Sequence, residues 1–91
     1  MRYLVTIDLG QASESSADYK NIGTGIETHY PDSLRIQKSA WLVNTEGRPS
    51  SIRDALFEHV KQPATLFITP IHSWASFNLS GEATTWLADY K

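Results

Sequence analysis

Strand-like runs alternate along this chain with two segments of helical periodicity, and the alternation restricts the fold more than any other feature. The strand-like runs are short and rich in β-branched and aromatic residues. In chain order, the sequence predicts a strand, a helix, two short strands, a second helix and a further strand. We expect these elements over residues 3–9, 16–30, 34–37, 40–44, 50–61 and 64–71.

The last part of the chain predicts a tail beyond this pattern. Residues 74–78 are a candidate for one more short strand, and residues 81–90 are expected to form a final helix. Leu79-Ser80 precedes that helix in the order typical of a hydrophobic staple and an N-cap. Ser51 and Asp54 have the spacing of a capping pair at the start of the helix over 50–61.

This order of elements predicts an α+β fold within a single domain, 1–91. A strand–helix–strand unit followed by a helix and a returning strand is typical of a ferredoxin-like split βαβ sandwich. Its antiparallel sheet would carry both helices on one face, with the strand/helix tail added at the C-terminus. Lys38-Ser39 is compatible with a tight turn or with a bend in one longer strand. Because an exposed sheet edge favours pairing with a second chain, we expect a symmetric homodimer.

Composition narrows the class of protein. The sequence has no cysteine, which excludes a disulfide framework and thiolate metal sites. It shows no basic leader with an apolar core, and no apolar run approaches the ~20 residues of a bilayer-spanning helix, so we expect a cytoplasmic protein without a membrane partner. The net charge of −2 is not typical of a nucleic-acid binder. Such a role would require a local basic patch or a bound cation.

Asp8 is the first candidate for chemistry, since it stands at the end of the first predicted strand, just before Gly10. A single carboxylate there would either cap a loop or project into a cleft. One carboxylate holds Mg²⁺ poorly, because the ion is usually bound by one or two carboxylates with waters and phosphates. A two-fold dimer that paired near this strand would bring two copies of Asp8 to one shared ion.

The cations are the second set of candidates. Arg35 and Lys38 flank one short predicted strand, and Arg48 and Arg53 follow in the middle of the chain. A dimer would double this positive charge and could contact a phosphate backbone. A solvated strand face explains the same residues without any ligand.

Three further features give weaker signals. His72 lies after a predicted strand, where it could serve as an acid, a base or a phosphate contact. Gly23-Thr24-Gly25 is a lone GxG without the rest of a phosphate-binding motif. The simplest interpretation of the three tryptophans is that they are core or interface residues. They are Trp41, Trp74 and Trp86.

Three stretches carry a resemblance to known families. "YLVTIDL" resembles the opening strand of the second CRISPR-associated protein family, and "RIQKSAWLV", residues 35–43, resembles that family's Arg-Val-Gln-x-Ser-Val-Phe segment. The pattern "WLVNT … IRDAL … ATLFITPI … W … F.LSGEATTWL" is closer to the SinR-like small proteins. The VapD-type ribonucleases are more distant relatives of the same fold.

The resemblance implies a ferredoxin-like homodimer. Some members of the family are metal-dependent endonucleases that act on RNA or DNA, and the first-strand aspartate of both subunits flanks one divalent ion; others are non-catalytic nucleic-acid scaffolds. That aspartate corresponds to Asp8, while Gln37 and Ser39 match positions expected near the strand pairing. The SinR-like C-terminal pattern and the net negative charge depart from the CRISPR-associated family.

Two hypotheses follow. The first is a Mg²⁺-dependent, endonuclease-like homodimer with Asp8 as catalytic metal ligand and with Arg35, Lys38 and Arg48 on the nucleic acid. The second is a catalytically inert relative of the same fold that binds a protein, as an adaptor or as an inhibitor carried on a mobile element.

Overall fold

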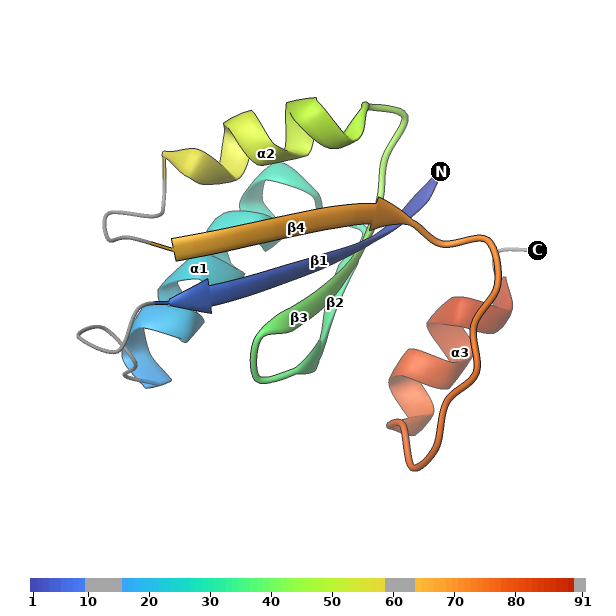
Figure 1. Cartoon of the computed structure of the whole chain (residues 1–91). Coiled ribbons are helices and arrows are strands. Elements are labelled where there is room, and N and C mark those ends of the chain that lie inside the picture. The colour runs from blue at the N-terminus through green and yellow to red at the C-terminus, as the bar shows by residue number, and fades with distance from the viewer. Residues whose placement is uncertain (10–15, 59–63, 90–91) are drawn as a thin grey trace.

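The computed structural model describes residues 1–9, 16–58 and 64–89, and it has the α+β architecture expected from the sequence (Figure 1). A four-stranded antiparallel sheet is combined with three helices, an arrangement consistent with the ferredoxin-like prediction. Within the described ranges, no helix has the length and apolar character needed to cross a membrane. The elements are β1 (Arg2–Leu9), α1 (Ser16–His29), β2 (Ser33–Gln37), β3 (Ala40–Asn44), α2 (Pro49–Phe57), β4 (Ala64–Pro70) and α3 (Gly81–Asp89).

The strands lie in the order β2-β3-β1-β4, and every neighbouring pair is antiparallel. Val5 at the centre of β1 pairs with Trp41 of β3 on one side and with Ile68 of β4 on the other. Lys38 and Ser39 form the turn of a β2–β3 hairpin, so the alternative of one bent strand is wrong. Pro70 ends β4, which is an edge strand, as its missing backbone donor requires.

One face of the sheet packs against α1 and α2. Alternate residues of β1 point to opposite faces, and those that face the two helices are all buried. Ile22 and Ile26 of α1 and Ile52 and Leu56 of α2 pack against them. β3 contributes Trp41 and Val43 to the same core; the β1 members are Tyr3, Val5, Ile7 and Leu9.

The two predicted helix starts have different outcomes. Ser80 is the N-cap of α3, because the backbone N–H of Ala83 donates to its Oγ at 3.1 Å. The predicted capping pair of Ser51 and Asp54 is wrong. α2 begins two residues before Ser51, at Pro49, whose fixed φ suits the first helical position and whose missing N–H leaves one donor fewer to satisfy. Residues 59–61, at the end of the predicted second helix, lie outside the described residues.

Residues 74–78 do not form the short strand that the sequence suggested. They belong to an irregular segment, 71–80, that joins β4 to α3. Asn78 has a φ of 61°, in the left-handed region that asparagine tolerates better than most residues. An extended strand cannot continue through that backbone conformation.

α3 lies against the second face of the sheet, the face that α1 and α2 leave open (Figure 1). Trp86 donates its indole N–H to Asp32 Oδ1 at 2.9 Å, and the Asp32 Oδ2 accepts a bond from the Asn44 side chain, also at 2.9 Å. The Arg2 guanidinium donates to the carbonyl of Leu87 at 3.1 Å. The first and last of these bonds attach α3 to Asp32, which precedes β2, and to Arg2 at the start of β1, while Asn44 at the end of β3 bonds to Asp32.

Candidate functional site

Asp8 occupies the second face of the sheet, near the C-terminal end of the central strand β1. Its side chain is exposed, whereas both of its neighbours in β1 are buried in the helix-covered core. It pairs with Thr65 of β4, and the next residue of β1 on the same face, Thr6, pairs with Phe67. Phe67 is 61% exposed. We name Thr6, Asp8, Thr65 and Phe67 the open-face patch.

The Asp8 carboxylate has neither an ion pair nor a hydrogen bond within the part of the chain that the structure describes. The loop that Asp8 would cap, residues 10–15, lies outside the described residues. Among the described residues, no group of three or more histidine, cysteine, aspartate or glutamate residues lies close enough together to hold a metal ion. Since a single carboxylate binds Mg²⁺ weakly, Asp8 would need ligands from a second chain or from a phosphate.

Arg35 faces the opposite side of the sheet from Asp8. It pairs with Trp41, whose indole lies in the helix-covered core, and its guanidinium carbon is 5.3 Å from the centroid of the Trp41 ring. Its Nε donates to the carbonyls of Gln37 at 3.3 Å and Lys38 at 3.2 Å. These bonds to the hairpin turn hold the guanidinium in one position.

Lys38 lies in the hairpin turn, next to Arg35. Its ammonium group is 5.5 Å from the centroid of the Tyr19 ring, a cation–π contact. The hydroxyl of Tyr19 accepts a bond from the backbone N–H of Leu9 at 3.3 Å, so Lys38 extends toward α1 at the end of the sheet where β1 finishes. Arg35 and Lys38 thus contact each other through the Lys38 carbonyl, while their charged groups lie over two different aromatic rings.

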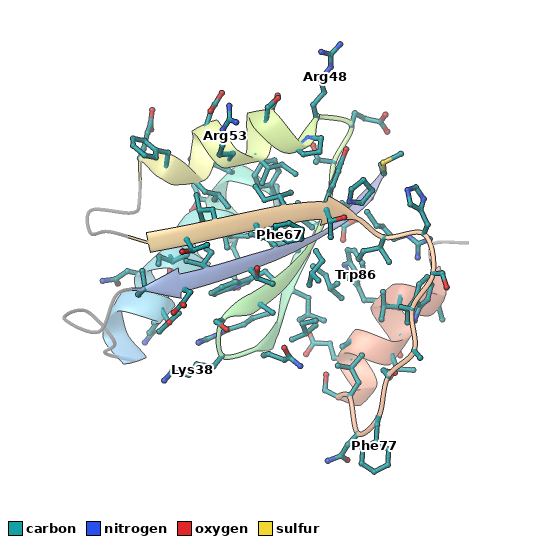
Figure 2. The ribbon with its side chains drawn as sticks, in the orientation of Figure 1. Lys38, Arg48, Arg53, Phe67, Phe77 and Trp86 are labelled. Atoms are coloured by element: carbon teal, nitrogen blue, oxygen red, sulfur yellow. The ribbon has the colours of Figure 1, made fainter. Side chains whose placement is uncertain are left out.

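Arg48 is not part of that pair. It is the exposed residue at the N-cap of α2, and its side chain forms no capping bond. Figure 2 shows Lys38 and Arg48 on opposite sides of the molecule. Arg53, one turn further along α2, pairs with Asp54 at 3.1 Å. The cations that cluster in the sequence therefore occupy two separate places on the surface.

The positions that the sequence suggested for strand pairing lie in the β2–β3 hairpin. Gln37 pairs with Ala40, after an irregularity in the register between Arg35 and Gln37. The carbonyl of Ser39 accepts a bond from the backbone N–H of Ile7 at 2.9 Å, which ties the turn to β1. His72 is exposed in the irregular segment that follows β4.

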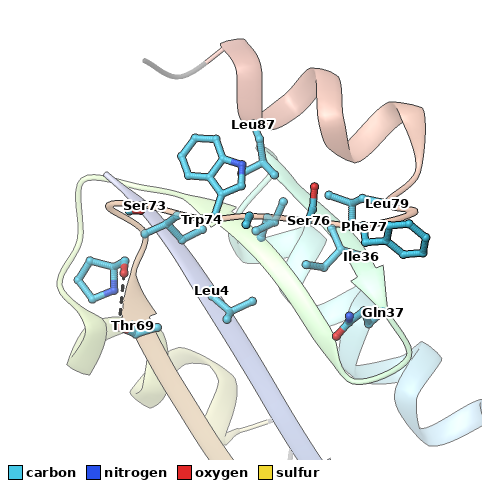
Figure 3. A pocket seen from close by; sticks show the side chains of 14 residues that line it. Leu4, Ile36, Gln37, Thr69, Ser73, Trp74, Ser76, Phe77, Leu79 and Leu87 are labelled. Atoms are coloured by element: carbon cyan, nitrogen blue, oxygen red, sulfur yellow. Dashed lines mark hydrogen bonds between the residues drawn. The ribbon is translucent and has the colours of Figure 1, made fainter.

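The sequence did not predict a groove that lies between the second face of the sheet, the 71–80 segment and α3. It encloses about 430 Å³, and Leu4 and Leu42 of the sheet line it together with Leu87 of α3 (Figure 3). Trp74 and Phe77 of the 71–80 segment also line it, and they are 46% and 96% exposed. The only signal in the sequence was that three tryptophans in a short chain include an interface candidate.

A second feature that the sequence did not predict is a small cleft between α1 and the β2–β3 hairpin. It encloses about 180 Å³ and is lined by side chains of both signs. The lining residues are Lys20, Gly23, Thr24 and Glu27 of α1, Arg35 of β2 and Trp41 of β3. Gly23 and Thr24 belong to the lone GxG of the sequence, although no glycine-rich loop is formed: both residues lie within α1.

Comparison with known proteins does not place the chain in a family: neither a protein-family model nor a curated protein matches it.

Proposed function

We propose that this chain is a Mg²⁺-dependent, endonuclease-like homodimer with a ferredoxin-like fold, acting on the phosphodiester bonds of RNA or DNA. Asp8 of each subunit is the metal ligand. The strand order β2-β3-β1-β4 and the antiparallel pairing support the proposed fold. The resemblance of the first strand and of residues 35–43 to the second CRISPR-associated protein family supports the proposed activity.

The observation that carries the proposal is the position of Asp8 in the open-face patch. A carboxylate there faces outward beside the exposed ring of Phe67. A two-fold pairing through this patch would bury both Phe67 rings, and it would place the two Asp8 carboxylates near the symmetry axis. A symmetric interface is self-complementary, so the second subunit supplies the acidic ligand that one chain lacks.

Phosphodiester cleavage at such an ion would require few protein groups besides the two Asp8 carboxylates. Two carboxylates leave most of the six positions around Mg²⁺ for waters and for phosphate oxygens. The ion can polarise the phosphoryl group or lower the pKa of a bound water that attacks it. Arg35 and Lys38 would hold the nucleic acid through their contacts with phosphate. Arg48, on the other side of the molecule, would meet a different part of the nucleic acid.

Mg²⁺ is expected to strengthen the homodimer of the wild type. Without the ion, two Asp8 carboxylates at one axis repel each other, and the ion removes that repulsion. In Asp8→Asn there is no repulsion to relieve, so its dimer dissociation constant should not depend on Mg²⁺. Sedimentation equilibrium with Mg²⁺ and with EDTA measures both constants. A protein that stays monomeric in both conditions would exclude the shared-ion site.

Cleavage is tested with RNA and with duplex DNA in the presence of Mg²⁺ or Mn²⁺. Asp8→Asn is expected to lose the metal-dependent cleavage, because the ion loses both of its protein carboxylates. Asp54→Asn removes one negative charge from the exposed surface of α2 and should cleave like the wild type. Equal cleavage by Asp8→Asn and the wild type would attribute the activity to a contaminant and remove Asp8 from the site.

Protein binding is the second candidate function, and the exposed aromatic residues of the 71–80 segment favour it. Large aromatic side chains are common anchors of protein interfaces, and Phe77 is almost fully exposed beside the groove. For an adaptor, we expect a stoichiometric partner that Phe77→Ser no longer binds, together with a melting temperature that does not respond to Mg²⁺. A melting temperature that rises with Mg²⁺ in the wild type but not in Asp8→Asn would favour the metal site instead.

A further inference from the structure

The cleft between α1 and the β2–β3 hairpin is lined by a residue with a buried hydrogen-bond donor. Trp41 is 1% exposed, and its buried indole N–H has no hydrogen-bond acceptor among the residues that the structure describes. Nearly all buried polar groups in proteins have a partner, and an unsatisfied one lowers stability. Gly23 of α1 lies directly against this group, since a Cβ at Gly23 would come within 3.3 Å of the indole nitrogen.

Two positively charged side chains, Arg35 and Lys20, line the same cleft. Arg35 lies over the Trp41 ring and is held there by the carbonyls of the hairpin turn. Those bonds use Nε and Nη2, so the N–H groups of Nη1 have no partner within the described part of the chain and can donate to a ligand. Lys20 is exposed on α1 and has no ion pair among the described residues. Among the described residues, Glu27 is the one carboxylate that lines the cleft.

We propose that this cleft binds a phosphate group, with the Trp41 N–H, the Arg35 guanidinium and the Lys20 ammonium as donors. All three donors belong to residues that line the cleft, a tetrahedral anion accepts hydrogen bonds from several donors at once, and arginine and lysine are the usual partners of phosphate. Lys38, over Tyr19, adds positive charge nearby.

This inference goes beyond the metal site. Its residues belong to α1, β2 and β3, and Arg35 and Trp41 occupy the face of the sheet opposite to Asp8. The cleft requires neither the divalent ion nor the dimer. The phosphate can belong to a nucleic-acid backbone or to a free phosphate compound, and both present the same oxygens to the three donors.

The indole N–H signals in a ¹H–¹⁵N NMR spectrum test the proposal. The chain has three tryptophans, so Trp74→Phe and Trp86→Phe identify the Trp41 signal by elimination. In a titration of the full chain with inorganic phosphate against chloride at equal ionic strength, we expect a saturating downfield shift of that signal. A hydrogen bond that forms at this N–H deshields its proton.

Charge variants show whether the shift comes from the cleft. Lys20→Gln and Arg35→Gln should each weaken phosphate binding about tenfold, which is the usual effect of losing one charge-assisted hydrogen bond. Glu27→Gln should tighten it about two- to threefold by removing the opposing charge. Arg53→Gln, which removes an exposed cation on α2, is the matched control and should leave the affinity unchanged.

Two results would overturn the proposal: a Trp41 signal that does not move with phosphate, or an equal loss of affinity in Lys20→Gln and Arg53→Gln. A short oligonucleotide without terminal phosphates separates the two sources. If it shifts the Trp41 signal, the cleft holds a backbone phosphodiester, and if only inorganic phosphate does so, the ligand is a free phosphate compound. Asp8→Asn should bind phosphate like the wild type, so loss of the metal site and loss of the cleft are distinguishable.

Discussion

Leu56→Ala is expected to lower the free energy of unfolding by about 2–5 kcal/mol, a large part of the roughly 5–15 kcal/mol that holds a typical domain folded. Leu56 is fully buried in the core between α2 and the sheet. Truncation removes buried methyl groups, and the neighbouring side chains of Ile52 and Ile26 cannot fully close the cavity. Urea unfolding followed by circular dichroism measures the change as a lower midpoint with an unchanged slope.

The adjacent residue provides the control. Phe57 belongs to the same helix but is 69% exposed, so Phe57→Ala should change the free energy of unfolding by less than about 0.5 kcal/mol. A similar loss in both variants would mean that the exposed Phe57 stabilises the fold as much as the buried Leu56, because helical propensity favours alanine at both positions. It would contradict a core that lies beneath one face of the helix.

The order of elements was predictable because each strand and helix has a hydrophobic period that survives in the folded molecule. The apolar residues of α1 follow a helical spacing, and Ile22 and Ile26 are buried as that spacing requires. The sequence of β3 is a continuous apolar run because side chains on both faces of this strand are buried. Trp41 and Val43 face α1 and α2, while Leu42 is buried on the second face.

The errors in the fold come from interactions that periodicity does not encode. Ser51 and Asp54 have the spacing of a cap, but Pro49 starts α2 earlier. Trp74 and Phe77 favour a strand, yet segment 74–78 pairs with no strand among the described residues and ends at the left-handed backbone of Asn78. A strand requires a partner, and local sequence does not reveal whether one is near.

The candidate site was predictable only in part, for a related reason. Position in a strand determines the face of a residue, and so the end of β1 indicated an accessible Asp8. The faces of Arg35 and Asp8 depend on the register of separate strands, which the structure supplies. The contact between Gly23 and the Trp41 indole joins α1 to β3, and nothing in either segment alone marks it.

Asp32→Ala is expected to lower the free energy of unfolding by about 2–4 kcal/mol, because it removes two side-chain hydrogen bonds to a carboxylate at once. Asp32 accepts from the Trp86 indole and from the Asn44 side chain, both at 2.9 Å. Without it, two partly buried donors lose their partner, and α3 loses its link to the start of β2. Hydrogen exchange should become faster in α3 than in β1, and the fluorescence of Trp86 should shift to the red.

Asp54→Ala is the matched control, since it removes an aspartate whose ion pair with Arg53 is exposed on α2. Exposed ion pairs contribute about 0–1 kcal/mol, so this variant should lie close to the wild type. If Asp32→Ala proves equally mild and α3 keeps its protection, the buried side chains of Ala83 and Leu87 hold the helix in place. In that case Asp32 is dispensable, and apolar burial on the second face is sufficient to fix the C-terminal helix.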